Sequence, residues 1–318
     1  MKRNMLGKSG IEVTELCFGT LPMGEVQSNL PLADGIDLIS EAIEKGINFF
    51  DGAQLYKNYG YLKGAMHKTG KKDIVISSKC VKKDYAGMED AILEAMQEMD
   101  RDYVDIFFLH APQGDDKVFE DRAGAWQCLL DYKQKGYLRA IGLATHKPSG
   151  VVAAAKRDDV DIIFPLINKM GWGFTDGSTV EQMLAAIEQG RKADKGMYAM
   201  KVFAGGHLVR MMPEAIQFVR DIPGIKALAI GMVNKKELDV QLRIFNGGKL
   251  SEEEVAGFIS TKNLKILDFI CTGCGKCMSA CGNDAMHIVN GKAQPVAENC
   301  VLCGYCVPAC PNFAIRMR

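Results

Sequence analysis

The sequence predicts an α/β fold, and two observations lead to this class. Over residues 14–245 of the 318-residue chain, short apolar runs rich in Ile, Val and Phe alternate eight times with stretches of helical periodicity. Eight strand–helix units in a segment of this length are typical of a (β/α)8 TIM barrel. The alternative is an open doubly wound sheet, which usually carries Gly-x-Gly-x-x-Gly after its first strand. That motif is absent, so the barrel is favoured.

The apolar runs are expected to be buried parallel strands, because each is short and is bounded by polar residues or glycine. In chain order they cover residues 14–19, 47–50, 74–78, 104–109, 138–145, 161–167, 197–200 and 227–233. The stretches between and after them are expected to be helices with one apolar face, such as the face that Ile36, Ile39 and Ile43 form before Gly46. The expected helices cover residues 35–45, 60–68, 88–99, 125–135, 148–157, 180–192, 213–221 and 235–245.

Two segments of a different kind follow the barrel. Residues 247–263 carry charge with little periodicity and are expected to form a connector. Within it, Ser251 and Glu254 have the spacing of a capping box, which predicts a short helix. Residues 264–318 are rich in cysteine and are expected to form a small α+β domain. We therefore expect a barrel over residues 1–246, a connector and a C-terminal domain.

Composition limits the class of protein further. Hydrophobic residues make up 47% and charged residues 25% of the chain, as in folded proteins rather than disordered ones. Lys plus Arg and Asp plus Glu are both 39, so the basic surplus typical of nucleic-acid binding is missing. No apolar run approaches the ~18 residues of a membrane span, and the first residues lack the apolar part of a signal peptide. We expect a cytoplasmic protein that binds neither nucleic acid nor membrane.

Most of the 11 cysteines lie in two runs of identical spacing. Each run reads Cys-x2-Cys-x2-Cys-x3-Cys, and the second run is followed by Pro311. The runs are Cys271, Cys274, Cys277 and Cys281, then Cys300, Cys303, Cys306 and Cys310. This is the pattern of bacterial two-cluster ferredoxins, in which the fourth cysteine of each run binds the other cluster. The remaining three, Cys17, Cys80 and Cys128, are expected to be small buried hydrophobes.

The two runs predict a bacterial-ferredoxin-like domain with two [4Fe–4S] clusters. One cluster is expected to be bound by Cys271, Cys274, Cys277 and Cys310, and the other by Cys300, Cys303, Cys306 and Cys281. Zinc is the alternative, because Cys-x2-Cys also occurs in zinc sites. Zinc knuckles contribute two ligands each rather than four in series, so the spacing favours iron and sulfide. Gly282 stands where the pattern has proline, which leaves the ligand Cys281 in place.

Residues with charged, imidazole or amide side chains follow seven of the eight apolar runs. They are Asp51, Lys79, His110, His146, Asn168, Lys201 and Asn234. Any one of them could simply be a solvated strand end. In a TIM barrel, however, the carboxyl ends of all strands meet at one face, where active sites lie. Together these residues predict a site at that face.

Several of these segments resemble the aldo-keto reductases. The Asp/Tyr/Lys/His tetrad of that family resembles residues in three stretches of this chain. These are Asp51 to Tyr56 (Asp-Gly-Ala-Gln-Leu-Tyr), Ile-Ser-Ser-Lys79 and Phe-Phe-Leu-His110. Leu6-Gly7-Lys8-Ser9-Gly10 and Phe18-Gly19-Thr20 are similar to its opening hairpin and first strand, and residues 199–206 to its seventh strand and loop. The resemblance covers about residues 3–245. With the cysteine-rich segment, the whole chain resembles the bacterial branch that carries a ferredoxin-type domain.

The resemblance implies that the barrel interconverts a small-molecule carbonyl and an alcohol with NAD(P)H. A free tyrosine has a pKa of ~10, so Tyr56 is a plausible acid, and the ammonium group of Lys79 would lower that pKa. Asp51 would keep Lys79 charged and oriented. A neutral His110 would donate to the carbonyl oxygen and set its angle. The expected catalytic residues are therefore Asp51, Tyr56, Lys79 and His110.

The family resemblance also implies the nicotinamide contacts. Thr145, His146 and Asn168 are expected at the carboxamide, Lys201 and Gly205 beside the pyrophosphate and adenosine, and Gly19, Thr20, Gly231 and Glu237 as further contacts. Glu237 stands where members that prefer NADP place an arginine. An acid suits the 2′-hydroxyl of NAD, whereas Lys235 and Lys236 would suit the phosphate of NADP, so both cofactors stay open. Trp172 and Phe174 are expected to border the substrate.

Two functions are compatible with these features. The first is an oxidoreductase whose barrel transfers hydride and whose clusters exchange single electrons with a ferredoxin- or flavodoxin-type partner. A hydride carries two electrons, whereas a [4Fe–4S] cluster exchanges one. Coupling therefore needs a flavin, a mediating protein or one-electron chemistry on the substrate, and no flavin motif is found. A structural role for the clusters is the remaining alternative. The second is an electron-transfer or redox-sensing subunit whose barrel is a docking scaffold without turnover. The complete tetrad favours the enzyme.

Overall fold

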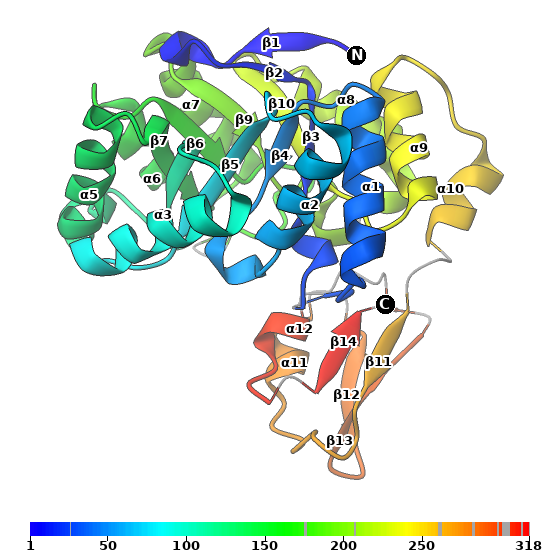
Figure 1. Ribbon diagram of the computed structural model, residues 1–318. Coiled ribbons are helices and arrows are strands. Elements are labelled where there is room, and N and C mark those ends of the chain that lie inside the picture. Colours follow the sequence, from blue (N-terminus) through cyan, green and yellow to red (C-terminus); the bar gives the residue numbers. More distant parts are fainter. Residues whose placement is uncertain are drawn as a thin grey trace.

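Eight parallel strands close into a barrel in which β10 pairs with both β9 and β3 (Figure 1). The computed structural model describes residues 1–25, 27–174, 177–206, 208–259, 263–281, 284–297, 299–300, 306–312 and 314–317. The strands are β3 (Leu16–Gly19), β4 (Phe49–Asp51), β5 (Val75–Cys80), β6 (Val104–His110), β7 (Leu138–Thr145), β8 (Ile162–Pro165), β9 (Gly196–Ala199) and β10 (Ile225–Gly231). All eight strands predicted from the apolar runs are confirmed.

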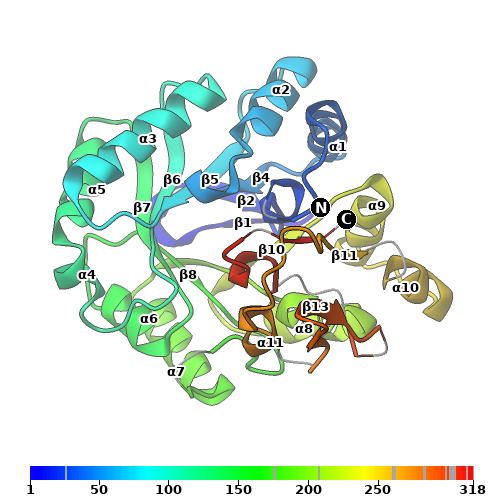
Figure 2. The same ribbon diagram turned by 90° about the horizontal axis from the view of Figure 1, so that it is seen from below.

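The eight predicted helices are confirmed as well and surround the barrel (Figure 2). They are α1 (Leu32–Glu44), α2 (Tyr59–Thr69), α3 (Tyr85–Met99), α5 (Ala123–Gln134), α6 (Pro148–Ala155), α7 (Val180–Lys192), α8 (Met212–Arg220) and α9 (Lys235–Phe245). The largest differences are at α1 and α3, each of which begins three residues before its predicted start at residue 35 or 88. Pro31 stands just before the first turn of α1, where a missing backbone N–H breaks no helical hydrogen bond. A further short helix, α4 (Val118–Asp121), lies in the loop after β6.

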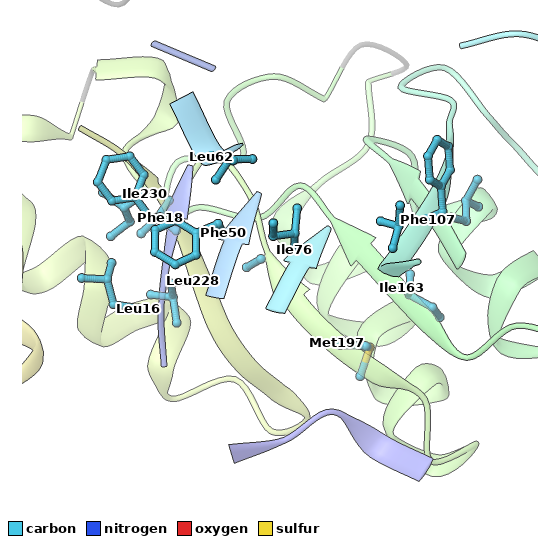
Figure 3. Packing of buried hydrophobic residues seen from close by; sticks show 14 of the residues in the cluster. Leu16, Phe18, Phe50, Leu62, Ile76, Phe107, Ile163, Met197, Leu228 and Ile230 are labelled. Carbon is cyan, nitrogen blue, oxygen red and sulfur yellow. The ribbon is translucent and has the colours of Figure 1, made fainter. Parts of the chain in front are cut away.

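Side chains alternate between two cores along each strand. On β6, Ile106 and Phe108 belong to a cluster inside the barrel, whereas Phe107 and Leu109 belong to a cluster between strands and helices. Successive side chains of a strand point to opposite faces, so a parallel strand buried on both faces must be apolar throughout. Figure 3 shows part of the outer cluster, where strand residues such as Ile76 pack near Leu62 of α2. This double burial explains why the strands are continuous apolar runs.

An antiparallel hairpin covers the end of the barrel where the strands begin (Figure 1). It consists of β1 (Arg3–Met5) and β2 (Glu12–Thr14), as the family resemblance predicts. Leu6, Ile11 and Val13 from this hairpin are fully buried in the inner cluster. The hairpin therefore closes the amino-terminal end of the barrel and leaves the carboxyl ends of the strands for a site.

The cysteine-rich segment forms two small antiparallel sheets with two short helices. β11 (Leu264–Ile266) pairs with β14 (Ile315–Met317), and β12 (Met286–Val289) pairs with β13 (Lys292–Pro295). The helices are α11 (Lys276–Ser279) and α12 (Cys306–Ala309). α10 (Glu252–Ile259) precedes the segment, and the predicted capping box at its start is confirmed by reciprocal hydrogen bonds between Ser251 and Glu254. Figures 1 and 2 place these sheets on the side of the barrel where the strands end.

A helix that crosses a bilayer needs about 20 predominantly apolar residues. Among the residues that the structure describes, no helix is both long enough and apolar enough to span a membrane.

The hairpin turn supplies a test of how the barrel end is closed. Gly7 has a φ of +52°, and a Cβ added there would lie 2.4 Å from the backbone nitrogen of Gly196. Gly7→Ala is expected to lower the free energy of unfolding by about 2–4 kcal/mol, because a left-handed backbone and a steric overlap both disfavour the methyl group. Urea denaturation followed by circular dichroism measures the change.

Gly10 is the matched control in the same turn. Its φ of +68° is similar, but no atom lies within 4 Å of an added Cβ. Gly10→Ala should therefore cost only the backbone contribution, about 1–2 kcal/mol. Equal losses in the two variants would show that contact with β9 does not restrict position 7.

Candidate active site

The four tetrad residues meet at the carboxyl ends of β4, β5 and β6. Asp51 is the last residue of β4, Lys79 lies near the end of β5 and His110 ends β6. Tyr56 ends a short 3-10 helix, Gln54–Tyr56, in the loop after β4. The Lys79 Nζ atom lies 4.9 Å from the centre of the Tyr56 ring, and the Tyr56 and His110 rings are 6.5 Å apart at 89°. The closed barrel thus brings together all four residues that the resemblance singled out.

Asp51 and Lys79 form a buried ion pair. Their side chains are only 7% and 2% exposed, and the Lys79 Nζ atom donates to both carboxylate oxygens of Asp51, at 2.9 and 2.7 Å. The same ammonium group donates to the carbonyl oxygen of Gly52 at 2.7 Å. Burial disfavours the charged form, but Asp51 and Tyr56 outweigh it and raise the pKa of Lys79. Lys79 therefore carries a positive charge beside Tyr56.

The pKa of Tyr56 is raised, chiefly because the side chain is buried. The charge and hydrogen bonding of Lys79 lower this pKa, as expected from the sequence, while the negative charge of Asp51 raises it. The expected net decrease is not found, because burial outweighs the contribution of Lys79. Tyr56 consequently keeps its proton, which suits a residue that donates a proton.

Two histidines at the site are uncharged. Burial, then Lys79 and further cationic neighbours, hold the pKa of His110 well below its ordinary value. Burial and Lys201 lower the pKa of His146 to about 3. The Nδ1 atom of His110 is buried, and within the described part of the chain it has no hydrogen-bond partner. A buried polar nitrogen of this kind is costly unless a ligand or water completes it.

Thr145 and Asn168, both predicted nicotinamide contacts, lie buried at the ends of β7 and β8. The Thr145 hydroxyl donates to the carbonyl oxygen of Gly114 at 2.8 Å. The Asn168 amide donates to the carbonyl oxygen of Trp172 at 2.9 Å, and its oxygen accepts the N–H groups of Met170 and Trp172 at 3.2 and 3.0 Å. Asn168 thus fixes the conformation of its own loop.

Gly19 and Thr20 lie at the end of β3, next to Asp51. The N–H and hydroxyl of Thr20 both donate to the backbone oxygen of Asp51, at 2.9 and 2.8 Å. A Cβ added to Gly19 would lie 3.3 Å from the backbone nitrogen of Gly231, so β3 and β10 approach closely at this end. These residues connect the first strand to its neighbours on both sides.

The loop after β9 contains backbone strain that the sequence did not signal. Lys201 and Ala204 have φ values of +57° and +48°, and they are followed by Gly205 at +68°. Residues with side chains rarely adopt this conformation, and such strain is concentrated at functional sites. Trp172 packs against this loop through Ala204 and Leu208. Phe174 is partly buried and packs against the outer core.

Glu237 lies in the first turn of helix α9, whose N-cap is Asn234. Its Oε2 atom accepts the N–H of Val233 at 2.9 Å, and its own N–H donates to the side chain of Asn234 at 2.9 Å. Its side chain is buried by this arrangement. Lys235 forms an ion pair with Glu41 at 2.9 Å. Of the three residues considered for the choice between NAD and NADP, Glu237 and Lys235 thus have structural partners, and that choice stays open.

The cysteine-rich segment has features that fit iron–sulfur ligation. Cys271, Cys277, Cys306 and Cys310 are buried, in one core with Met286, Ala293 and Ile315. Backbone N–H groups of Ala293, Ala285 and Ala314 point at the sulfurs of Cys271, Cys281 and Cys310, each at 3.3 Å. Such N–H···S bonds support thiolates bound to a cluster. Cys274 is exposed and Cys300 half-buried, while Cys303 lies outside the described residues.

The three isolated cysteines are buried and unpaired, as predicted. Burial raises the pKa of the thiols of Cys17, Cys80 and Cys128, the last to about 12. A raised pKa suppresses the reactive thiolate, which agrees with the expectation that these residues are small buried hydrophobes.

Comparisons with known proteins agree with this geometry. Residues 15–222 match the model of the aldo/keto reductase family, and residues 263–311 match a 4Fe-4S dicluster domain. An uncharacterized oxidoreductase, YqkF of Bacillus subtilis, is 20% identical over 80% of this chain and 94% of its own length. L-galactose dehydrogenase of Arabidopsis thaliana is 30% identical over 43% of this chain and 46% of its own length.

Solved structures share the fold. A putative aldo-keto reductase from Pseudomonas aeruginosa superposes with a TM-score of 0.65 at 21% identity, over 77% of this chain and 94% of that one. The holo form of aldo-keto reductase AKR11C1 from Bacillus halodurans gives a TM-score of 0.65 at 19% identity, over 80% and 94%. With a family match over most of its barrel and a second match beyond it, the chain is an oxidoreductase that belongs to the aldo/keto reductase family and carries a 4Fe-4S dicluster domain after the barrel.

Proposed function

We propose that the barrel interconverts a small-molecule carbonyl and the corresponding alcohol with NAD(P)H, and that Tyr56 is the acid and base. The observation that carries this proposal is the buried Asp51–Lys79 ion pair beside a protonated Tyr56. A lysine at a solvated strand end would be exposed to water, whereas the Lys79 side chain is only 2% exposed and its ammonium group is hydrogen-bonded to Asp51 and Gly52. A charge held in this way serves a neighbour whose own charge changes during a reaction.

Bound NAD(P)H supplies the hydride, and side chains of the protein donate and accept the proton. Neutral His110 donates an N–H to the carbonyl oxygen and fixes its direction. Tyr56 then gives its hydroxyl proton to that oxygen as negative charge develops on it. Lys79 stabilises the phenolate that remains, and Asp51 keeps Lys79 charged. In the reverse direction the phenolate of Tyr56 accepts the proton of the alcohol.

We further propose that residues 264–318 bind two [4Fe–4S] clusters and exchange electrons with a ferredoxin- or flavodoxin-type partner. The ligand sets would be Cys271, Cys274, Cys277 and Cys310 for one cluster, and Cys300, Cys303, Cys306 and Cys281 for the other. The 4Fe-4S dicluster match and the N–H···S bonds support this assignment. These sheets lie on the side where the strands end, the same side as the tetrad, which suits electron exchange with the barrel (Figure 1).

A docking role without turnover is the second candidate. One observation favours it: a relative 26% identical over 53% of this chain is named a probable voltage-gated potassium channel subunit beta, from Arabidopsis thaliana. Anaerobic titration of the purified chain with NADH and NADPH separates the two functions. Nicotinamide binding with carbonyl turnover supports the enzyme. Reduction of the clusters by a ferredoxin without nicotinamide binding supports the docking role.

Replacement of Tyr56 tests the enzyme directly. Tyr56→Phe removes the proton donor and is expected to lower kcat by at least ~100-fold, the usual contribution of a positioned acid. NADPH binding, followed by nicotinamide fluorescence, should be retained, because only the hydroxyl group is lost. Stopped-flow measurement of NADPH oxidation with a panel of aldehydes gives the rates.

Tyr61→Phe is the control for that variant. The Tyr61 hydroxyl donates to the carbonyl oxygen of Leu30 at 2.7 Å, in contact with α1 and not with the tetrad. This variant should keep the full rate. If Tyr56→Phe also kept it, Tyr56 would not be the acid.

Two cysteine variants test the ligand sets. Cys310→Ala and Cys303→Ala should each lower the iron content from about eight to about four atoms per chain, because each removes a ligand of a different cluster. The double variant should lose nearly all iron and sulfide. Iron and sulfide analysis with EPR of the dithionite-reduced protein measures this.

Cys128→Ala is the matched control, since Cys128 is a buried cysteine on α5. It should retain all the iron. Full iron content in either single ligand variant would contradict the assignment.

A further inference from the structure

A layer of hydroxyl groups lies directly beneath the Asp51–Lys79 pair. Ser77 of β5 donates to the Oδ1 atom of Asp51 at 2.9 Å. Tyr198 of β9, on the far side of the barrel, places its hydroxyl 3.2 Å from the same oxygen and 2.9 Å from the Ser77 Oγ atom. Both side chains are completely buried. Asp51 therefore receives hydrogen bonds from below as well as from Lys79.

The ring of Tyr198 is held in place by aromatic neighbours inside the barrel. It stacks on Phe164 with the ring centres 3.9 Å apart at 19°, and it meets the edge of Phe49 at 4.8 Å and 62°. Phe108 lies 6.0 Å away. Because the ring has no room to move, the hydroxyl stays under the carboxylate. An aromatic core could be built with phenylalanine here, so packing alone does not account for the hydroxyl group.

The titratable groups around these two tyrosines are few. Asp51 and the thiol of Cys17 face Tyr198, and together with burial they hold the pKa of Tyr198 well above its ordinary value. Its hydroxyl therefore remains a hydrogen-bond donor. Lys79, Asp51 and the neutral His110 face Tyr56. Asp51 thus lies between a tyrosine that keeps its proton and one that, by the proposed function, gives it up.

We propose that Tyr198, with Ser77, is a positioning residue that orients the Asp51 carboxylate toward Lys79 and so controls how tightly Tyr56 holds its proton. This inference rests on the proposed function. Hydrogen bonds that a carboxylate accepts spread its negative charge and weaken its field on neighbours. Asp51 favours the protonated form of Tyr56, whereas Lys79 favours the phenolate. Without the Tyr198 hydroxyl, the field of Asp51 strengthens and Tyr56 becomes a weaker acid.

Tyr198→Phe tests this inference because it removes the hydroxyl and keeps the ring. The pKa of Tyr56 is expected to rise by about 0.5 unit or more. The titration is followed by 13C NMR of protein labelled at the tyrosine Cζ carbon. The Tyr56→Phe variant identifies the signal of Tyr56. Reduction requires protonated Tyr56 and is lost as pH rises through its pKa, so the alkaline limb of the kcat profile should move upward by the same amount. At neutral pH, kcat should fall about threefold to tenfold with KM for NADPH unchanged.

Tyr132→Phe is the matched control. The Tyr132 hydroxyl donates to the Glu89 carboxylate at 2.9 Å, within the helical layer and remote from the tetrad. Both variants should lose thermal stability, but only Tyr198→Phe should shift the titration of Tyr56. If Tyr198→Phe does not fold, Ser77→Ala provides the same comparison, with Ser77→Thr restoring the hydroxyl and the wild-type titration.

The outcomes distinguish this inference from the proposed function. An unchanged Tyr56 titration in Tyr198→Phe and Ser77→Ala, with stability lowered as in Tyr132→Phe, would overturn the positioning role. A shifted titration in a chain that reduces no carbonyl would uphold the positioning role and reject the proposed function. A shifted titration together with the shifted kcat limb would support both.

Discussion

The site depends on one charge pair placed where water does not reach. Transfer of a carboxylate and an ammonium group out of water costs several kcal/mol per ion, and their attraction repays this only if the remaining donors and acceptors are satisfied. The surroundings of Asp51 and Lys79 meet that condition through Gly52, Ser77 and Tyr198. Hydrophobic residues would fill the same space at lower cost. The pair is thus better explained by what its charge does for Tyr56 than by any contribution to folding.

The barrel provides this arrangement because one of its ends is closed by the hairpin and the other holds the candidate active site. At one end, the hairpin and its buried residues Leu6, Ile11 and Val13 exclude water. In the middle, the rings of Phe49, Phe108, Phe164 and Tyr198 fill the interior and form a rigid support. At the carboxyl ends of the strands, Asp51 and Lys79 meet the hydroxyl groups of Ser77 and Tyr198 in the interior. A buried charge there rests on a packed core, so its position is set by strand register rather than by flexible loops.

The sequence predicted the barrel well because a strand buried on both faces is apolar along its whole length, and such runs are visible without homologues. The tetrad came from its resemblance to a family. Tyr198 was missed because a tyrosine within an apolar run is indistinguishable from a core residue until its hydroxyl is located. Asn168 and Glu237 show what only the folded chain reveals: nearby backbone groups hydrogen-bond to both side chains, while their cofactor contacts stay predictions. The net pKa of Tyr56 depends on burial, which only the folded chain defines.

A barrel that transfers hydrides and a domain with two clusters differ in the number of electrons they exchange at once. The geometry of the barrel limits where a carrier between them could lie. In the proposed arrangement, two clusters together accept the two electrons of one hydride, but each takes one at a time. A nicotinamide gives its two electrons together, so the intermediate carrier must be stable after losing a single electron. The described part of the barrel interior is filled by aromatic side chains, which confines any such carrier to the carboxyl-terminal face. That is the face on which the cysteine-rich sheets lie (Figure 2). A flavin, a substrate radical or a docked redox protein would therefore have to act there, between Tyr56 and the clusters.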